Sequence, residues 1–386
     1  MDEPQTILLP RYGQRALADV VPALLAAQGV EGLPNVLAVP AARTVCLLLI
    51  DGLGWQLLRE HAELAPVLSS MAAGTEPITA GFPSTTATSV ASIGTGLTPG
   101  QHGVVGYAFA VPGQPLLNAL RWGTQLGERR DLREQLVPEQ VQPLPTMFER
   151  AAADGIEVTV TAPIIQRRSG LTRAVLRGGT FRTGFALGDL CTIAAAGLAG
   201  PGRQFCYAYH GDLDLVGHVY GPGSAPWRQQ LRFVDQLVAG IAESLPPDGL
   251  LVVTADHGMV ATTGPDRIDA DTEPELLAGV RLLGGEARVR HVYTEPGATP
   301  EVAARWAELL GDRALVRTRD EAIAAGWFGP VVSDRVLPRL GDLIVAMLGN
   351  SGVVRGVAEA AEAGMIGQHG SLTPAEQYVP LLFARG

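Results

Sequence analysis

Four short apolar runs, separated by longer helix-like segments, are the feature that most restricts the fold of this 386-residue chain. Such alternation favours βαβ units and a mainly parallel sheet with helices on both faces. The runs predict buried strands at Thr44–Ile50, Glu157–Pro163, Gln204–His210 and Gly249–Ala255. A helical period over residues 229–243 predicts a crossover helix. We therefore expect an α/β fold.

The pattern changes near Thr262, where strand, turn, helix and strand signals follow in close succession. This change predicts a small α/β subdomain inserted at residues 265–338. The surrounding core is then formed by residues 1–264 and 339–386. We expect the core to resume with the apolar run Gly341–Leu348.

Composition restricts the class of protein further. Hydrophobic residues make up 47% of the chain, which is enough for a large core, but the apolar runs are too short to cross a bilayer. The acidic N-terminus does not resemble a signal peptide. The net charge of -10 argues against binding to nucleic-acid polymers. We expect a cytoplasmic monomer with no membrane partner.

Acidic and histidine side chains follow three of the predicted strands, and one more histidine lies between glycines near the C-terminus. The carboxyl ends of parallel strands share one edge of a sheet, so these groups can converge. Carboxylate and imidazole together suit zinc, manganese or iron. The candidates are Asp51, Asp214, His218, Asp256, His257 and His369.

Each fragment also has a simpler interpretation. An Asp-Gly pair after a strand is typical of a turn, which would explain Asp51. Asp214 and His218 are four residues apart, which is typical of an ion pair on a helix. The coincidence of all the fragments favours a site.

Four hydroxyl residues (Ser84, Thr85, Thr86 and Thr88) stand at the start of a segment of small residues that is expected to be helical. Serine and threonine favour helix starts, so one of them could simply cap the helix. Alternatively, a hydroxyl lies there because an anion binds at the positive end of the helix.

Taken together, five stretches resemble the alkaline phosphatase superfamily. They are "IDGLG", "FPSTTATSVASIGTGLTPGQHGVVGY", "DLVGHVYGP", "TADHGM" and "GQHGS". The resemblance is to the branch of type I phosphodiesterases and nucleotide pyrophosphatases, with phosphonoacetate hydrolase as a relative. It implies an alkaline-phosphatase-like fold and a threonine nucleophile nine residues before Thr95. That residue is Thr86, with Thr85 as the alternative.

The resemblance also implies two divalent ions, Mn²⁺ or Zn²⁺. One would be held by Asp214, His218 and His369. The other would be held by Asp51, Asp256, His257 and the Thr86 oxygen. Ser89 stands where many relatives have asparagine, so backbone N–H groups near Ala87 are expected to share the phosphate charge. The candidate substrate contacts are Ala87, Ser89, Tyr107 and Trp122.

Within the branch, the chain looks most like actinobacterial cyclic di-AMP phosphodiesterases. This implies hydrolysis of cyclic di-AMP to pApA and AMP. The alternatives are a nucleotide pyrophosphatase, a phosphonate or phosphomonoester hydrolase, and an inactive nucleotide sensor. A sulfatase is not indicated, because the chain lacks a Cys/Ser-x-Pro-x-Arg segment.

Overall fold

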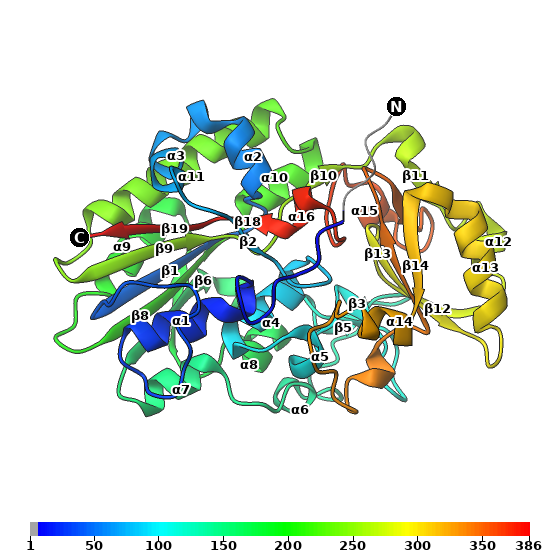
Figure 1. Ribbon diagram of the computed structural model, residues 1–386, viewed down its shortest axis with the longest axis horizontal. Helices are drawn as coiled ribbons and strands as arrows, with labels where there is room; N and C mark the ends of the chain where they lie inside the picture. The colour runs from blue at the N-terminus through cyan, green and yellow to red at the C-terminus, as the bar shows by residue number, and fades with distance from the viewer. Residues whose placement is uncertain (1–6) are drawn as a thin grey trace.

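The computed structural model describes residues 7–386 and is built around a six-stranded sheet with helices on both faces (Figure 1). The strand order is β19-β9-β1-β8-β6-β7, and only β19 runs antiparallel to its neighbour. The strands are β1 (Thr44–Ile50), β6 (Glu157–Pro163), β7 (Thr180–Gly184), β8 (Gln204–His210), β9 (Gly249–Thr254) and β19 (Leu381–Arg385). The predicted α/β class and mainly parallel sheet are confirmed.

All four predicted strands of the core are present in this sheet. Every residue of β1 is buried, as expected for a central parallel strand covered by helices on both faces. The edge strand β7 was not predicted from the sequence. Its first four residues alternate between exposed and partly buried positions, so it lacks the continuous apolar run of the central strands.

Helices pack on the two faces of the sheet (Figure 1). One face carries α3 (Pro66–Ala72), α9 (Leu187–Ala196) and α11 (Ala225–Glu243). The other face carries α1 (Val20–Ala27), α4 (Thr86–Thr95) and α7 (Met147–Ala153). Helix α11 contains the predicted crossover segment and is capped by Ser224, whose hydroxyl accepts from the Trp227 N–H. Smaller helices are α2 (Trp55–Glu60), α5 (Pro99–His102), α6 (Pro138–Val141), α8 (Gly170–Val175), α10 (Asp212–Tyr220), α15 (Ala360–Ala363) and α16 (Pro374–Gln377).

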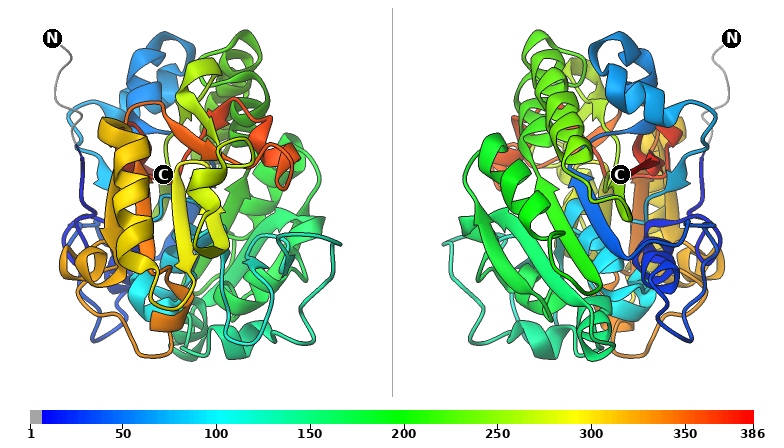
Figure 2. Two further views of the ribbon diagram at one scale, coloured as in Figure 1. Left: turned by 90° about the vertical axis from the view of Figure 1, so that its right-hand side faces the viewer. Right: turned by 90° about the vertical axis from the view of Figure 1, so that its left-hand side faces the viewer.

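A second, antiparallel sheet lies beyond the carboxyl ends of the core strands (Figures 1 and 2). Its order is β12-β13-β15-β14. Helix α13 (Thr299–Leu310) packs on its outer face, with α12 (Pro274–Leu277) and α14 (Arg319–Ala324) nearby. The strands are β12 (Val280–Glu286), β13 (Val289–Thr294), β14 (Ala314–Thr318) and β15 (Leu343–Met347).

The position of β15 corrects one expectation. We expected the core to resume with Gly341–Leu348, but β15 pairs with β13 and β14 of the second sheet. Leu343, Val345 and Met347 belong to the cluster beneath α13, whereas Ile344 and Ala346 face the main core. Both faces of β15 are buried, and its sequence is apolar throughout. The same sequence pattern is typical of a central strand of the core. The division at residues 265 and 338 remains a proposal.

Short strand pairs tie the C-terminal segment to the core. Strand β17 (Gly367–Gln368) pairs with β10 (Val260–Ala261), and β18 (Tyr378–Val379) pairs with β2 (Ile78–Thr79). The first pair lies next to His369 in the sequence and places it beside His257. The second pair fixes the segment that precedes α4. The remaining strands are β3 (Ala108–Phe109), β4 (Leu117–Asn118), β5 (Gly123–Thr124), β11 (Arg267–Asp269) and β16 (Gly352–Val354).

Candidate metal centre

Asp51 and Asp256 meet because they follow the adjacent strands β1 and β9. Oδ1 of Asp256 accepts hydrogen bonds from the backbone N–H groups of Gly52 and His257, both at 3.1 Å. Its second oxygen lies 3.6 Å from Nε2 of His257, and Oδ1 of Asp51 lies 3.4 Å from the same nitrogen. All three side chains are buried. The ends of two strands thus bring two carboxylates and an imidazole together.

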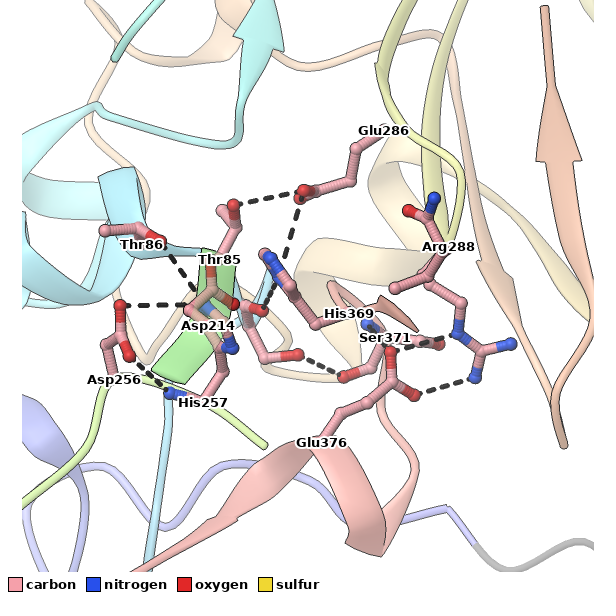
Figure 3. Close-up of polar contacts among 12 residues, drawn as sticks. Thr85, Thr86, Asp214, Asp256, His257, Glu286, Arg288, His369, Ser371 and Glu376 are labelled. Carbon is pink, nitrogen blue, oxygen red and sulfur yellow. Dashed lines mark hydrogen bonds and ion pairs between the residues drawn. The ribbon is translucent and has the colours of Figure 1, made fainter. Parts of the chain in front are cut away.

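Asp214 and His218 occupy one face of α10, which follows β8. Oδ2 of Asp214 lies 3.2 Å from Nε2 of His218. Nε2 of His369 lies 3.3 Å from the same His218 nitrogen. The rings of His257 and His369 are stacked with centroids 3.5 Å apart. The structure therefore brings all six predicted acid and histidine candidates into one largely buried cluster. Figure 3 shows four of them, Asp214, Asp256, His257 and His369, beside Thr86.

Each of the three histidines has its Nδ1 facing a backbone carbonyl. The distances are 2.7 Å from His218 to Gly367, 3.0 Å from His257 to Gly258, and 3.0 Å from His369 to Ser84. A carbonyl can only accept, so Nδ1 must carry the proton in each ring. When a ring is neutral, its Nε2 atom then directs a lone pair into the cluster. This is the arrangement in which histidines bind metals.

The carboxylates carry a second sign of a cation site. Oδ1 of Asp51, Oδ1 of Asp214 and Oδ2 of Asp256 are buried without a hydrogen-bond partner in residues 7–386. Burial, together with the charges of Asp256 and Asp214, raises the pKa of Asp51 well above its usual range. Burial likewise raises the pKa of Asp256. Unpaired buried carboxylates are costly unless a cation compensates them.

Two sets of three ligand atoms lie within 4.8 Å of one another: those of Asp51, Asp256 and His257, and those of Asp214, His257 and His369. Oxygen and imidazole nitrogen donors in this number suit a transition-metal ion or zinc. The residues therefore fit the expected metal. The assignment of individual ligands to two ions, with His218 beside Asp214 and His369, remains a prediction.

Thr86 is the first residue of α4, a helix of small residues in which every residue is buried. Its Oγ1 lies 3.3 Å from Nε2 of His257. The helix packs closely against α8, since a side chain at Gly94 would lie 1.9 Å from the Val175 carbonyl oxygen. This contact lies near the C-terminal end of α4 and fixes the position of the helix against α8.

Thr85 occupies the N-cap position of α4, but its hydroxyl does not cap the helix. It donates instead to Oε2 of Glu286 at 3.2 Å. The Ser84 hydroxyl donates to the Ser371 carbonyl at 2.8 Å. The Ser84 hydroxyl thus faces the C-terminal segment, the Thr85 hydroxyl faces Glu286 and the Thr86 hydroxyl faces the cluster, so the capping interpretation fails for all three.

Two predicted substrate contacts need correction. The Ser89 hydroxyl is buried and donates to the Asp256 carbonyl at 2.8 Å, so it positions a metal candidate instead of facing substrate. Trp122 is fully buried, and its indole N–H donates to the Leu136 carbonyl at 2.6 Å. Large apolar rings commonly serve the core, and the sequence does not distinguish that role from base stacking.

A cavity of about 200 Å³ opens from the cluster toward the second sheet, and we call it the cap cavity. Thr86, Asp214 and His369 lie at one end, and Tyr107 lies in its wall. The Tyr107 hydroxyl donates to Glu362 at 3.0 Å. Ala87 is buried in the first turn of α4. Tyr107 thus remains available as a substrate contact.

Glu286 and Tyr209 are site residues that the sequence did not identify. Glu286 ends β12, lines the cap cavity and lies 3.9 Å from Nδ1 of His369. Burial raises the pKa of its carboxyl to about 8. Tyr209 donates to Oδ2 of Asp51 at 2.5 Å. No local pattern marks either residue, because each reaches the site through long-range contacts.

A search of residues 7–386 for bilayer-crossing helices finds no helix with both the length and the apolar composition required.

Comparison with known sequences gives one family match. The model described as type I phosphodiesterase/nucleotide pyrophosphatase matches residues 45–372. Human ectonucleotide pyrophosphatase/phosphodiesterase family member 7 is 34% identical over 104 residues, which is 22% of this chain and 23% of that protein. A phosphopentomutase from Anaeromyxobacter dehalogenans is 28% identical over 179 residues, which is 46% of this chain and 42% of that protein. The chain spans less than half the length of these relatives.

Two solved structures have a similar fold. An inactive variant of murine ectonucleotide pyrophosphatase/phosphodiesterase 5 in complex with AMP gives a TM-score of 0.68 at 16% identity, covering 88% of this chain and 87% of that one. Phosphonoacetate hydrolase from Sinorhizobium meliloti gives 0.64 at 19% identity, covering 90% and 91%. At these identities the likeness is one of fold.

Proposed function

Because the chain belongs to the type I phosphodiesterase/nucleotide pyrophosphatase family, we propose that its metal centre hydrolyses a phosphodiester bond of a nucleotide, with Thr86 as the nucleophile. The observation that carries the proposal is the position of Thr86. Thr86 is the first residue of α4, and its hydroxyl lies against the largely buried cluster of three carboxylates and three imidazoles. A helix N-terminus adds partial positive charge where a phosphate would bind.

The cluster would hold divalent cations, for which Mn²⁺ and Zn²⁺ are our candidates. Asp51, Asp256 and His257 would form one set, and the second would comprise Asp214, His218 and His369. Bound cations would lower the pKa of a coordinated hydroxyl and offset the charge of an incoming phosphate. This offset is needed because the chain has a net charge of -10.

The chemical steps then use the side chain of Thr86. Its Oγ1 forms a bond to phosphorus while the bond from phosphorus to the leaving alcohol breaks. Water cleaves the resulting threonyl ester in a second displacement and regenerates the hydroxyl. Backbone N–H groups in the first turn of α4, near Ala87, would stabilise the charge that develops on the phosphoryl oxygens.

For the substrate we propose cyclic di-AMP, cleaved to pApA and AMP. The support is the sequence resemblance to cyclic di-AMP phosphodiesterases, together with a cavity beside Thr86 that contains an aromatic ring, Tyr107. Product analysis tests the proposal. The protein, reconstituted with Mn²⁺ or Zn²⁺, is incubated with cyclic di-AMP, dinucleoside polyphosphates, phosphonates and phosphomonoesters. Release of pApA supports it. Release of AMP from polyphosphates without attack on cyclic di-AMP favours a nucleotide pyrophosphatase.

A further inference from the structure

Tyr209, in strand β8, contacts the metal-ligand candidate Asp51, which follows the adjacent strand β1. Its hydroxyl donates to Oδ2 of Asp51 at 2.5 Å, in the range expected when a hydroxyl donates to a carboxylate. The backbone N–H of Asp51 also donates to the His210 carbonyl, at 2.9 Å. Asp51 is thus fixed to β8 through both its main chain and its side chain.

The hydrogen bond from Tyr209 makes the two oxygens of Asp51 unequal. Oδ2 is engaged by Tyr209, whereas Oδ1 is buried without a hydrogen-bond partner in residues 7–386 and lies 3.4 Å from Nε2 of His257. A carboxylate that only tied the two strands together would leave Oδ1 as an unpaired buried acceptor, at a cost in stability. Oδ1 is therefore the atom that a cation would contact.

Asp256 shows the same division between its two oxygens. Its Oδ1 accepts from two backbone N–H groups, and its Oδ2 is buried without a partner in the described part of the chain. The set of Asp51, Asp256 and His257 thus offers two single carboxylate oxygens and one imidazole nitrogen. Such a set suits Zn²⁺, which commonly takes about four ligands. Ca²⁺ takes about six to eight oxygens and often uses both oxygens of a carboxylate.

A tyrosine suits this position because its hydroxyl is a neutral donor. An arginine in its place would also hold Oδ2, but its positive charge would offset the negative charge that attracts a cation. The phenol of Tyr209 orients the carboxylate and leaves that charge in place. Hydrogen bonds of this kind fix the orientation of a ligand and influence which metal it binds.

We propose that Tyr209 is a positioning residue that makes Asp51 a one-oxygen ligand and so gives this site a preference for Zn²⁺ over Ca²⁺. Without the hydroxyl, Oδ2 would be free to contact an ion together with Oδ1, which is a common arrangement in Ca²⁺ sites. The inference rests on the metal centre of the proposed function and adds a residue that selects the ion.

The test measures the dissociation constants of Zn²⁺ and Ca²⁺ by competition with chromophoric chelators, on protein stripped with EDTA and then desalted. In Tyr209→Phe we expect Zn²⁺ to bind about tenfold to a hundredfold more weakly, while Ca²⁺ binding is unchanged or tighter. The preference for Zn²⁺, as the ratio of the Ca²⁺ constant to the Zn²⁺ constant, should therefore fall by at least about tenfold.

Tyr207→Phe is the matched control. Tyr207 lies two residues earlier on the same face of β8, and its buried hydroxyl has no hydrogen-bond partner in residues 7–386. Removing this hydroxyl should leave the ratio of the two constants unchanged.

A purely structural role for Tyr209 gives a different result. Loss of its bond to Asp51 would then lower the melting temperature in EDTA and weaken the binding of both ions by the same factor. An unchanged ratio in Tyr209→Phe, or an equal fall in Tyr207→Phe, overturns the proposal. An Asp51→Ala background gives a second check. Because Tyr209 is proposed to act through Asp51, Tyr209→Phe should alter neither constant there, and a further loss of Zn²⁺ preference would contradict the proposal.

Metal binding separates this inference from the proposed function. If the wild type hydrolyses no diester but Tyr209→Phe lowers the preference for Zn²⁺, the proposed function fails and the inference stands. If the wild type hydrolyses a nucleotide diester and the ratio does not change in Tyr209→Phe, only the inference fails. A wild type without a measurable preference for Zn²⁺ over Ca²⁺ also overturns it.

Discussion

The hydroxyl oxygen of Thr86 lies 3.3 Å from Nε2 of His257, at the N-terminus of a fully buried helix. The neighbouring hydroxyl of Thr85 turns toward Glu286, 3.2 Å away (Figure 3). Two adjacent threonines thus have different environments. Only Thr86 faces the cluster of carboxylates and imidazoles, which supports its choice as the nucleophile.

Asp256→Asn should abolish metal-dependent activity while preserving the fold. The amide oxygen can still accept from the N–H groups of Gly52 and His257. The amide nitrogen would replace Oδ2, which is buried without a partner, and present donors to the cluster. We expect calorimetry with Mn²⁺ to show weaker binding or fewer sites. Because one of several buried, mutually repelling carboxylates is removed, the melting temperature in EDTA should equal or exceed that of the wild type.

Wild-type protein provides the control for this variant. Prolonged chelation should abolish its turnover, and added Mn²⁺ or Zn²⁺ should restore it. The ion should also stabilise the folded protein and so raise its melting temperature. At a free ion concentration of a hundred times the dissociation constant, the added free energy of unfolding is about 2.7 kcal/mol. Full activity of a verified metal-free sample would contradict the metal centre.

The stability of the metal-free protein should fall as pH rises from about 7 to 8.5. Burial raises the pKa of Glu286 from 4.5 to about 8, so the folded state holds a proton that the unfolded chain releases. This contribution to stability is lost as pH rises through about 8. His218 acts in the same direction: although burial opposes protonation, Asp214 raises the pKa of the imidazole to about 9.

Thermal melts in EDTA from about pH 7 to 8.5 test the predicted fall in stability with pH. Glu286→Gln should flatten it, because glutamine does not titrate. Glu301→Gln is the control, since Glu301 has a side chain that is 78% exposed and pairs with Arg305 on the surface of α13. A melting temperature that is constant or rises with pH would show that Glu286 is ionised in the folded protein.

The buried ion pair between Arg288 and Glu376 should stabilise the segment that carries His369. Both side chains are fully buried, with contacts of 3.0 Å and 2.7 Å, and Glu376 also accepts from the Ser371 N–H at 3.0 Å. Glu376→Gln would leave a buried guanidinium without its counter-charge. We expect a loss of about 3–5 kcal/mol in the free energy of unfolding, measured with urea.

Two further variants control this prediction. The double change Arg288→Met with Glu376→Leu should recover much of the loss, because no buried charge remains. Glu301→Gln, which breaks an exposed pair, should cost less than about 1 kcal/mol. A similar loss for the single and double changes would mean that packing, rather than charge, is responsible.

The core strands and the cluster could be predicted because both depend on local patterns. Asp51 and Asp256 each follow a buried apolar run, and parallel topology then brings them together. The same reasoning failed for β15. Its apolar run indicates burial on both faces, but which strands it joins depends on pairing with β13 and β14.

Residues that reach the site from distant elements were beyond local reasoning. Glu286 stands at the end of a hairpin strand in the second sheet, and its role depends on where that sheet docks. Trp122 illustrates the opposite error. It lies near a motif in the sequence, but its ring packs against Gly170, where an added side chain would approach to 2.0 Å.

Thr86→Ala should lower kcat by about three orders of magnitude or more, because the proposed nucleophile is lost. Metal binding should weaken only slightly, since the carboxylates and imidazoles remain. Thr86→Ser should keep partial activity, because the hydroxyl remains and only the methyl group that restricts its rotamer is removed. Thr85→Ala is the matched control and should have a mild effect, since its hydroxyl contacts Glu286 and not the cluster.

The stereochemical course at phosphorus tests the same mechanism independently. Attack by Thr86 followed by attack of water gives two in-line displacements, and each inverts the configuration. The net result is retention. Direct attack by water is a single displacement and gives inversion. A chiral phosphorothioate diester hydrolysed in isotopically labelled water distinguishes the two outcomes. Inversion, or a near-normal rate for Thr86→Ala, would mean that Thr86 only begins the helix and that another group attacks phosphorus.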